Sequence, residues 1–194
     1  MTDGRGSRDS GRVSREPERP DGAPWIVEAY RQHFAYVYAL VGRLGVHSAN
    51  VEDTTQEVFL ILHRRREEFR GESSVRTWLH GIAVHVARRQ RDAARRRAAK
   101  LHEIAEPLPP SPPDAELDRR QALRRLDRLL DSLVDEQREV FVLAEVAGCS
   151  APEIAEALGL NINTVYSRLR LARGRLQRAL ESLRAEEGAR HGAA

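Results

Sequence analysis

Hydrophobic residues recur every three or four positions along most of the chain, which is the period of an amphipathic helix. In residues 25–44 one helix face collects six large apolar residues, and Gly45 follows as a stop signal. A second apolar stripe, which includes Trp78 and Leu79, begins after Ser73 or Ser74. No segment shows the alternation that a half-buried strand requires. The pattern therefore predicts helices and no sheet.

The helix between these two stripes carries an unusual apolar run. Asn50 is placed to cap it, and we expect it to continue to about Phe69. Residues 58–62 are five consecutive apolar positions, which cannot all face one side of a helix. Some of them either contact both neighbouring helices or meet a partner protein. From periodicity alone, the two explanations are equally good.

A proline-rich stretch divides the chain. Five of the nine prolines lie in 107–113, which cannot be the interior of a helix, and we expect 101–114 to be a semi-rigid linker. The expected fold is all-α, with two small helical domains joined by this linker. The domains are 25–100, with three helices, and 115–185, and the polar ends 1–24 and 186–194 are expected to be disordered tails.

The second domain contains the spacing of a helix-turn-helix. Ser150 and Glu153 form a capping-box pattern with Pro152 in the first turn, and Gly159 marks a tight turn before a longer helix. The face of that helix opposite its apolar stripe carries polar and arginine side chains suited to a DNA groove. With the two flanks, these are Asn163, Thr164, Tyr166, Ser167, Arg168, Arg170 and Arg173. The alternative is an ordinary helical hairpin with a solvated arginine face.

The distribution of charge is more informative than the net charge of +3. Residues 25–100 hold 14 basic and 8 acidic side chains, whereas 114–160 hold 6 basic and 11 acidic. Residues 161–178 then carry five arginines and no acid. Two basic regions separated by an acidic one predict two separate contacts with a polyanion.

The first basic region follows a serine-rich loop and runs along the third predicted helix. Such a helix can hold a DNA backbone while the loop and nearby aromatic residues engage unstacked bases. The candidate residues are Ser73, Ser74, Arg76, His80, His85 and Arg88. Trp78 lies on the apolar stripe, so we expect it in the core rather than as a stacking platform.

Composition excludes several classes of protein. The single cysteine, Cys149, excludes a disulfide framework and a cysteine-only zinc site, and we expect it to be a small buried residue rather than a redox sensor. No apolar run could span a membrane, and 1–24 does not resemble a secretory signal, so we expect a cytoplasmic chain without membrane insertion. No nucleophile motif, phosphate loop or acidic cluster appears, so we expect no catalytic residue, metal or cofactor.

Several short motifs, in the same order along the chain, resemble those of a known protein family. They are Asp53-x-x-Gln56-Glu57-x-Phe59, Ser74-x-x-Thr77-Trp78-Leu79-x-x-Ile82-Ala83, Leu133-x-x-Glu136-Gln137-Arg138, Glu153-Ile154-Ala155 and Thr164-Val165-x-Ser167-Arg168-Leu169-x-x-Ala172. Together they closely resemble an extracytoplasmic-function (ECF, group IV) bacterial RNA polymerase sigma factor of the sigma-70 family, over about residues 25–184.

The resemblance implies an initiation factor that is not an enzyme and that acts in stress or envelope responses. Its first domain would be region 2, which binds the β′ clamp helices of core RNA polymerase and melts the −10 element. Its second would be region 4, which binds the −35 element and the β flap. By matching position, Asp53, Gln56 and Glu57 would lie at the polymerase contact. An anti-sigma factor is a further expected partner.

The chain departs from the family's pattern at three positions that concern DNA. The family usually has Asn where His85 stands, often a basic residue at Tyr166, and Arg at Leu171. These differences affect which promoter sequence is read. Two rival functions remain open: a stand-alone helix-turn-helix regulator, which normally requires a dimer, and a DNA-processing enzyme such as a recombinase.

Overall fold

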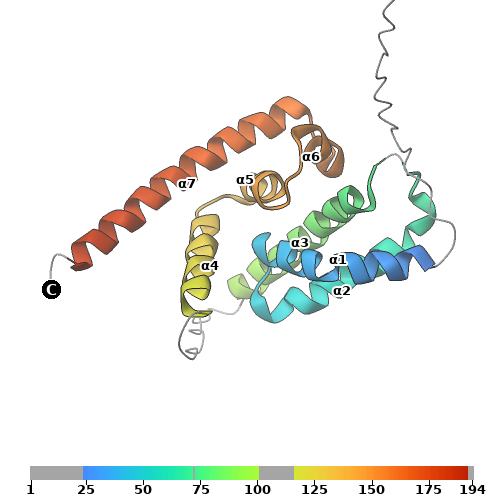
Figure 1. Ribbon diagram of the computed structural model, residues 1–194, viewed down its shortest axis with the longest axis horizontal. Coiled ribbons are helices and arrows are strands. Elements are labelled where there is room, and N and C mark those ends of the chain that lie inside the picture. The colour runs from blue at the N-terminus through green and yellow to red at the C-terminus, as the bar shows by residue number, and fades with distance from the viewer. Residues whose placement is uncertain (1–23, 72, 101–115, 192–194) are drawn as a thin grey trace, which may run out of the picture.

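The computed structural model describes residues 24–71, 73–100 and 116–191, and throughout this part of the chain the regular structure is helical. The first domain consists of α1 (Pro24–Arg43), α2 (Val51–Arg64) and α3 (Val75–Lys100). The second domain consists of α4 (Glu116–Asp131), α5 (Asp135–Phe141), α6 (Ala151–Leu158) and α7 (Ile162–His191) (Figure 1). Short turns of 3₁₀-helix span Ser48–Asn50 and Arg66–Glu68, and a π-helical turn spans Val142–Val146. The tail 1–23 and the predicted linker 101–114 lie outside the described residues.

The first domain is a three-helix bundle, as the apolar stripes predict. α1 ends at Arg43, and Gly45 takes a φ of 88°, a left-handed conformation in which glycine has little steric cost. Val37, Val58 and Leu79, one from each helix, are fully buried in the bundle. The spacing of the apolar residues thus predicts both the helices and the faces that pack together.

Two details of α2 differ from the prediction. The Asn50 side chain makes no capping bond, whereas the backbone carbonyl oxygen of Asn50 accepts a hydrogen bond from Thr54 Oγ1 at 2.6 Å. The helix ends at Arg64 rather than near Phe69, and a 3₁₀ turn follows. The bend lets Phe69 fold back into a buried position, with its ring 5.6 Å from that of Trp25 and 5.3 Å from that of Trp78.

The second domain confirms the predicted caps. The Glu153 N–H donates to Ser150 Oγ, and the Ser150 N–H donates to Glu153 Oε2 at 2.7 Å, which completes the capping box. Gly159 has a φ of 63° and ends α6. α7 continues to His191, past position 186, where we expected a disordered tail to begin.

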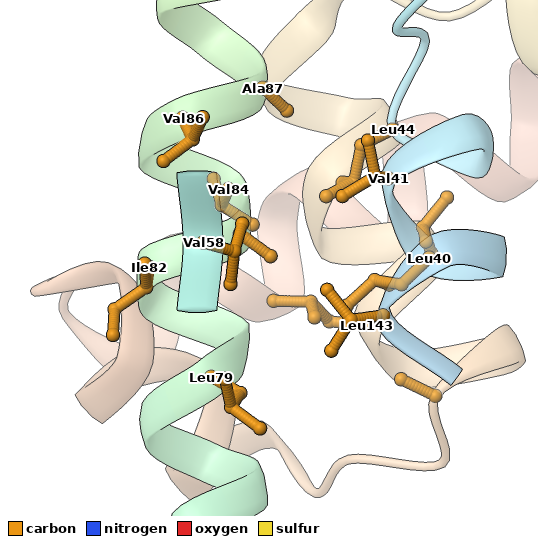
Figure 2. Close-up of a cluster of buried hydrophobic side chains, with 14 of the residues drawn as sticks. Leu40, Val41, Leu44, Val58, Leu79, Ile82, Val84, Val86, Ala87 and Leu143 are labelled. Atoms are coloured by element: carbon orange, nitrogen blue, oxygen red, sulfur yellow. The ribbon is translucent and has the colours of Figure 1, made fainter. Parts of the chain in front are cut away.

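The two domains pack directly against each other, which the sequence pattern did not predict. The π-helical turn of the second domain contacts α1. α6 contacts α3, beside which it lies in Figure 1. Leu143, from that turn, is fully buried and lies beside Leu40 of α1 (Figure 2). One hydrophobic core therefore extends across both domains. No helix among the described residues is long and apolar enough to cross a membrane.

Candidate nucleic-acid and protein interfaces

The α6–α7 pair has the geometry of a helix-turn-helix. Ile154 and Val165 are fully buried between the helices, and the Leu160 N–H donates to the Ala155 carbonyl at 2.8 Å across the turn. Asn161 Oδ1 accepts from the Asn163 N–H at 2.9 Å, so a side chain satisfies an amide at the start of α7. The turn chemistry and the buried contacts together fix the direction in which α7 projects.

The predicted DNA-contact residues of α7 lie on its outer surface. Asn163, Tyr166, Ser167 and Arg170 are exposed, while Thr164 and Arg168 are half-buried at the edge of the face. Arg173 is exposed and donates to Glu145 Oε1 at 2.6 Å. Leu171 is also exposed, which adds an apolar side chain to a surface rich in cationic and hydrogen-bonding groups. This face can contact phosphates and base edges.

The six predicted residues of the first domain fall into two groups, and Arg88 belongs to both. Ser74 Oγ accepts from the Thr77 N–H at 3.0 Å and thus caps the start of α3. A groove of about 330 Å³ between α3 and α6 is lined by Ser73, His85 and Arg88, together with the partly buried Trp78. Trp78 therefore packs on the core, as expected, and also borders this groove.

The second group lies on the face of α3 that meets the second domain. Arg76 donates to the Ala147 carbonyl at 2.8 Å, and its guanidinium lies 4.4 Å from the centre of the Tyr36 ring. Arg88 donates to Glu139 Oε1 at 2.7 Å. His80, instead of facing solvent, is buried. In this conformation these three side chains are engaged by other parts of the chain.

His80 has a partner at each ring nitrogen, one in its own domain and one in the second domain. Nε2 lies 2.7 Å from the Tyr36 hydroxyl oxygen, and Nδ1 lies 3.1 Å from Cys149 Sγ. Burial and the positive charge of Arg76 lower the pKa of His80 to about 4. Burial also raises the pKa of the Cys149 thiol to about 11, with a further contribution from Glu153. At neutral pH the pair is therefore uncharged. Cys149 is partly exposed rather than buried as predicted, and its raised pKa makes it a poor nucleophile.

The unfolding free energy should decrease in mild acid because of His80. Its pKa is lower in the folded chain than the unfolded value near 6.5, so its contribution is fully present above about pH 6.5 and is lost as the pH falls towards about 4. The charged or titratable groups around it are Arg76, Tyr36, Cys149, Glu153 and His33.

Urea titrations at pH 7 and pH 5 measure this effect. The wild-type chain should lose more stability between the two pH values than His80→Gln, which cannot take up the proton. His33, whose pKa is also lowered by burial and by Arg76, is present in both proteins. Equal losses in the two proteins would contradict the assignment.

The outward face of α2 carries the residues predicted to contact polymerase. Asp53 and Gln56 are exposed, and Glu57 forms an ion pair with Arg89 of α3. Within the 58–62 run, Val58, Phe59 and Leu62 are buried, whereas the side chain of Leu60 is 54% exposed. The exposed Leu60 is available to a partner protein.

Exposed apolar groups continue this surface onto α1. Tyr30 is exposed and its ring lies 4.9 Å from that of Phe59, and Val27 is exposed one turn earlier. An apolar patch bordered by carboxylate and amide groups is typical of a protein contact.

Sequence reasoning missed the residues that join the domains. Glu139 is completely buried and accepts hydrogen bonds from both Arg88 and Arg91. Arg138 donates to the Arg43 carbonyl at 2.7 Å, above Gly45. The one sequence feature that indicated a contact between the domains was the opposite net charge of 25–100 and 114–160.

No group of three His, Cys, Asp or Glu side chains in the described part of the chain could hold a metal ion.

Two family models match the chain, one on each side of the predicted linker. Residues 29–97 match the family model "Sigma-70 region 2", and residues 123–176 match "Sigma-70, region 4". The chain is 30% identical over 195 residues to the ECF RNA polymerase sigma factor SigG of Mycobacterium tuberculosis; the alignment covers 88% of this chain and 52% of SigG, so the chain spans about half the length of that relative.

A second relative is covered more completely. The ECF RNA polymerase sigma factor SigM of M. tuberculosis is 32% identical over 154 residues, which are 79% of this chain and 76% of SigM. The fold resembles the sigma factor RpoE in its complex with the anti-sigma factor NepR from Bartonella quintana, with a TM-score of 0.64 and 23% identity over 80% of this chain and 96% of that one. The chain belongs to the ECF sigma factors of the sigma-70 family.

Proposed function

We propose that the chain is a transcription initiation factor that binds core RNA polymerase and directs it to promoters with a −10 and a −35 element. The observation that carries this proposal is the presence of both family regions, each with a surface of suitable chemistry. α7 presents a polar and cationic face, and α2 presents an acidic and apolar one. The factor would catalyse no reaction itself and would act in the cytoplasm, where polymerase and promoters are.

In the proposed complex, α7 enters the major groove of the −35 element with its N-terminus first. Asn163, Tyr166, Ser167 and Arg170 are exposed near that end and would meet base edges or the nearest phosphates. Thr164 stands beside them, and Arg168 and Arg173 would hold phosphates on the two flanks. The β flap would contact this domain elsewhere on its surface.

The −10 strand would meet the loop before α3 and the helix itself. Ser73 and His85 lie beside Trp78 on the first-domain wall of the groove, where an unstacked base could enter once α6 has moved away. Ser74, Arg76, His80 and Arg88 complete the proposed set. Arg76, His80 and Arg88 contact the second domain in the structure, so promoter binding through them requires the domains to separate.

The polymerase contact would involve α2. Asp53, Gln56 and Leu60 recur at helical spacing and are exposed together, with Glu57 at the border. We assign this face to the β′ clamp helices. An anti-sigma factor is a further proposed partner, supported by the fold it shares with RpoE in its anti-sigma complex, and stress or envelope signals would act through it.

The alternative is a stand-alone helix-turn-helix regulator, which would bind DNA as a dimer without polymerase. Gel filtration and footprinting on genomic promoter fragments separate the two functions. We expect a monomer that protects promoter DNA only when core polymerase is added. A dimer that protects a two-fold site by itself would contradict the proposal.

A further inference from the structure

The second domain covers the face of α3 to which the proposed function assigns the −10 element. We propose that the chain inhibits itself: residues 135–149 act as an internal competitor for promoter DNA, and a buried ionic lock at Glu139 holds this closed state. The inference rests on the proposed function and adds a regulatory step to the same site. It follows from the contacts between the domains.

Glu139 is the centre of the lock. Its carboxylate is completely buried, with Arg88 Nε 2.7 Å from Oε1, Arg88 Nη2 bonded to Oε2, and Arg91 Nη2 2.7 Å from Oε1. A buried carboxylate is stable only when its charge is matched by such partners. Both arginines belong to α3, so the charge is satisfied only while the domains are together.

Further ion pairs of the same polarity surround the lock. Asp135 accepts from Arg95 at 2.7 Å and lies 3.3 Å from Arg91, and although burial opposes the shift, these two arginines lower its pKa. Arg43 of α1 bonds Asp127 of α4 at 2.7 Å. In each pair the first domain supplies the cation and the second supplies the carboxylate.

This polarity explains why the closed state competes with DNA. The acidic side chains of the second domain occupy positions beside Arg88 and Arg91 where phosphates would otherwise bind. Arg88 cannot contact Glu139 and a DNA strand with the same donors. The opposite charges of 25–100 and 114–160 therefore serve the contact between domains as well as separate contacts with DNA.

A close backbone contact completes the closed state. Gly81 of α3 lies against α6, where a Cβ atom would be 2.8 Å from the Ala157 carbonyl oxygen. Any side chain at position 81 would therefore push the domains apart. Inside the first domain an alanine there would be tolerated, because alanine favours a helix more than glycine does.

Two substitutions in the full-length chain open the lock by different routes. Gly81→Ala acts through steric clash and leaves every charge in place, while Glu139→Gln removes the charge and keeps the volume. Gly42→Ala is the matched control, since a Cβ there has Val51 Cγ2 at 4.0 Å as its nearest neighbour.

Cys149, the single cysteine of the chain, reports the opening. It contacts His80 across the interface, where burial raises its pKa, so it should react slowly with a thiol reagent in the closed state. We expect Gly81→Ala and Glu139→Gln to increase its rate of modification at least tenfold over wild type and Gly42→Ala. A fluorescein-labelled single-stranded oligonucleotide of random sequence should bind both variants correspondingly more tightly.

The outcomes separate the lock from the proposed function. Unchanged rates of Cys149 modification in both variants would show that these contacts do not hold the domains together. Faster modification without tighter oligonucleotide binding would show that the covered face is not inhibited. Either result overturns the proposal. If both responses appear but the wild-type chain supports no transcription with core polymerase, the lock is supported and the promoter function fails.

Discussion

Leu60→Asp should weaken binding of core RNA polymerase about 30-fold or more, which corresponds to the ~2 kcal/mol of an interface hot spot. Leu60 is 54% exposed in the free chain, so the substitution removes little buried contact area and should leave the fold intact. At the proposed interface it would place an unpaired carboxylate among apolar atoms. Titration of labelled chain with purified core polymerase measures the change.

Two further variants sharpen this experiment. Leu180→Asp makes the same change at an exposed leucine of α7, outside both matched regions, and should bind core polymerase like wild type. Asp53→Arg tests the acidic part of the face without disturbing the Glu57–Arg89 ion pair. If Leu60→Asp and Asp53→Arg both retain wild-type affinity, α2 does not form the polymerase contact.

Arg170→Ala should relax the base preference at one position of the −35 element, with a loss of about 1–3 kcal/mol at the preferred base. Arg170 is exposed near the start of α7 and has no hydrogen-bond or ion-pair partner among the described residues, so it is available to a base edge. Arg173→Ala is the matched comparison. Arg173 stands on the flank, paired with Glu145. Its removal should weaken binding to all DNA sequences equally and should reduce the slope of log affinity against log salt concentration by about one unit.

The measurement is binding of the holoenzyme to a library of −35 sequences at several salt concentrations. The full chain is needed because the core of the second domain is continuous with that of the first. If Arg170→Ala lowers only the salt slope and leaves every base preference unchanged, then Arg170 contacts phosphate. The recognition helix would then be rotated in the groove relative to the proposed orientation.

Local signals in the sequence were sufficient for most helices and for the helix-turn-helix. The capping box at Ser150 and the turn at Gly159 act through neighbouring backbone groups, so one sequence contains them completely. The apolar run 58–62 left open whether its residues contact both neighbouring helices or a partner protein, and it did not indicate which residue would be exposed. That depended on how α2 packs between α1 and α3, which leaves Leu60 outside.

What the sequence did not predict depends on contacts between distant residues. Arg88 and Glu139 are 51 positions apart, and nothing near either one indicates that they meet. His80 lies beside the apolar stripe of α3 and is buried between Tyr36 of α1 and Cys149 of the second domain. The end of α2 at Arg64 similarly depends on Phe69 packing against Trp25 and Trp78.

Run-off transcription with purified core polymerase tests the central claim most directly. Core polymerase alone should give no specific product on genomic promoter fragments, and addition of the chain should give discrete transcripts from a subset of them. The same transcripts should disappear with Leu60→Asp and persist with Leu180→Asp. Products that are identical with and without the chain would contradict the claim that it is the promoter-recognition subunit of RNA polymerase.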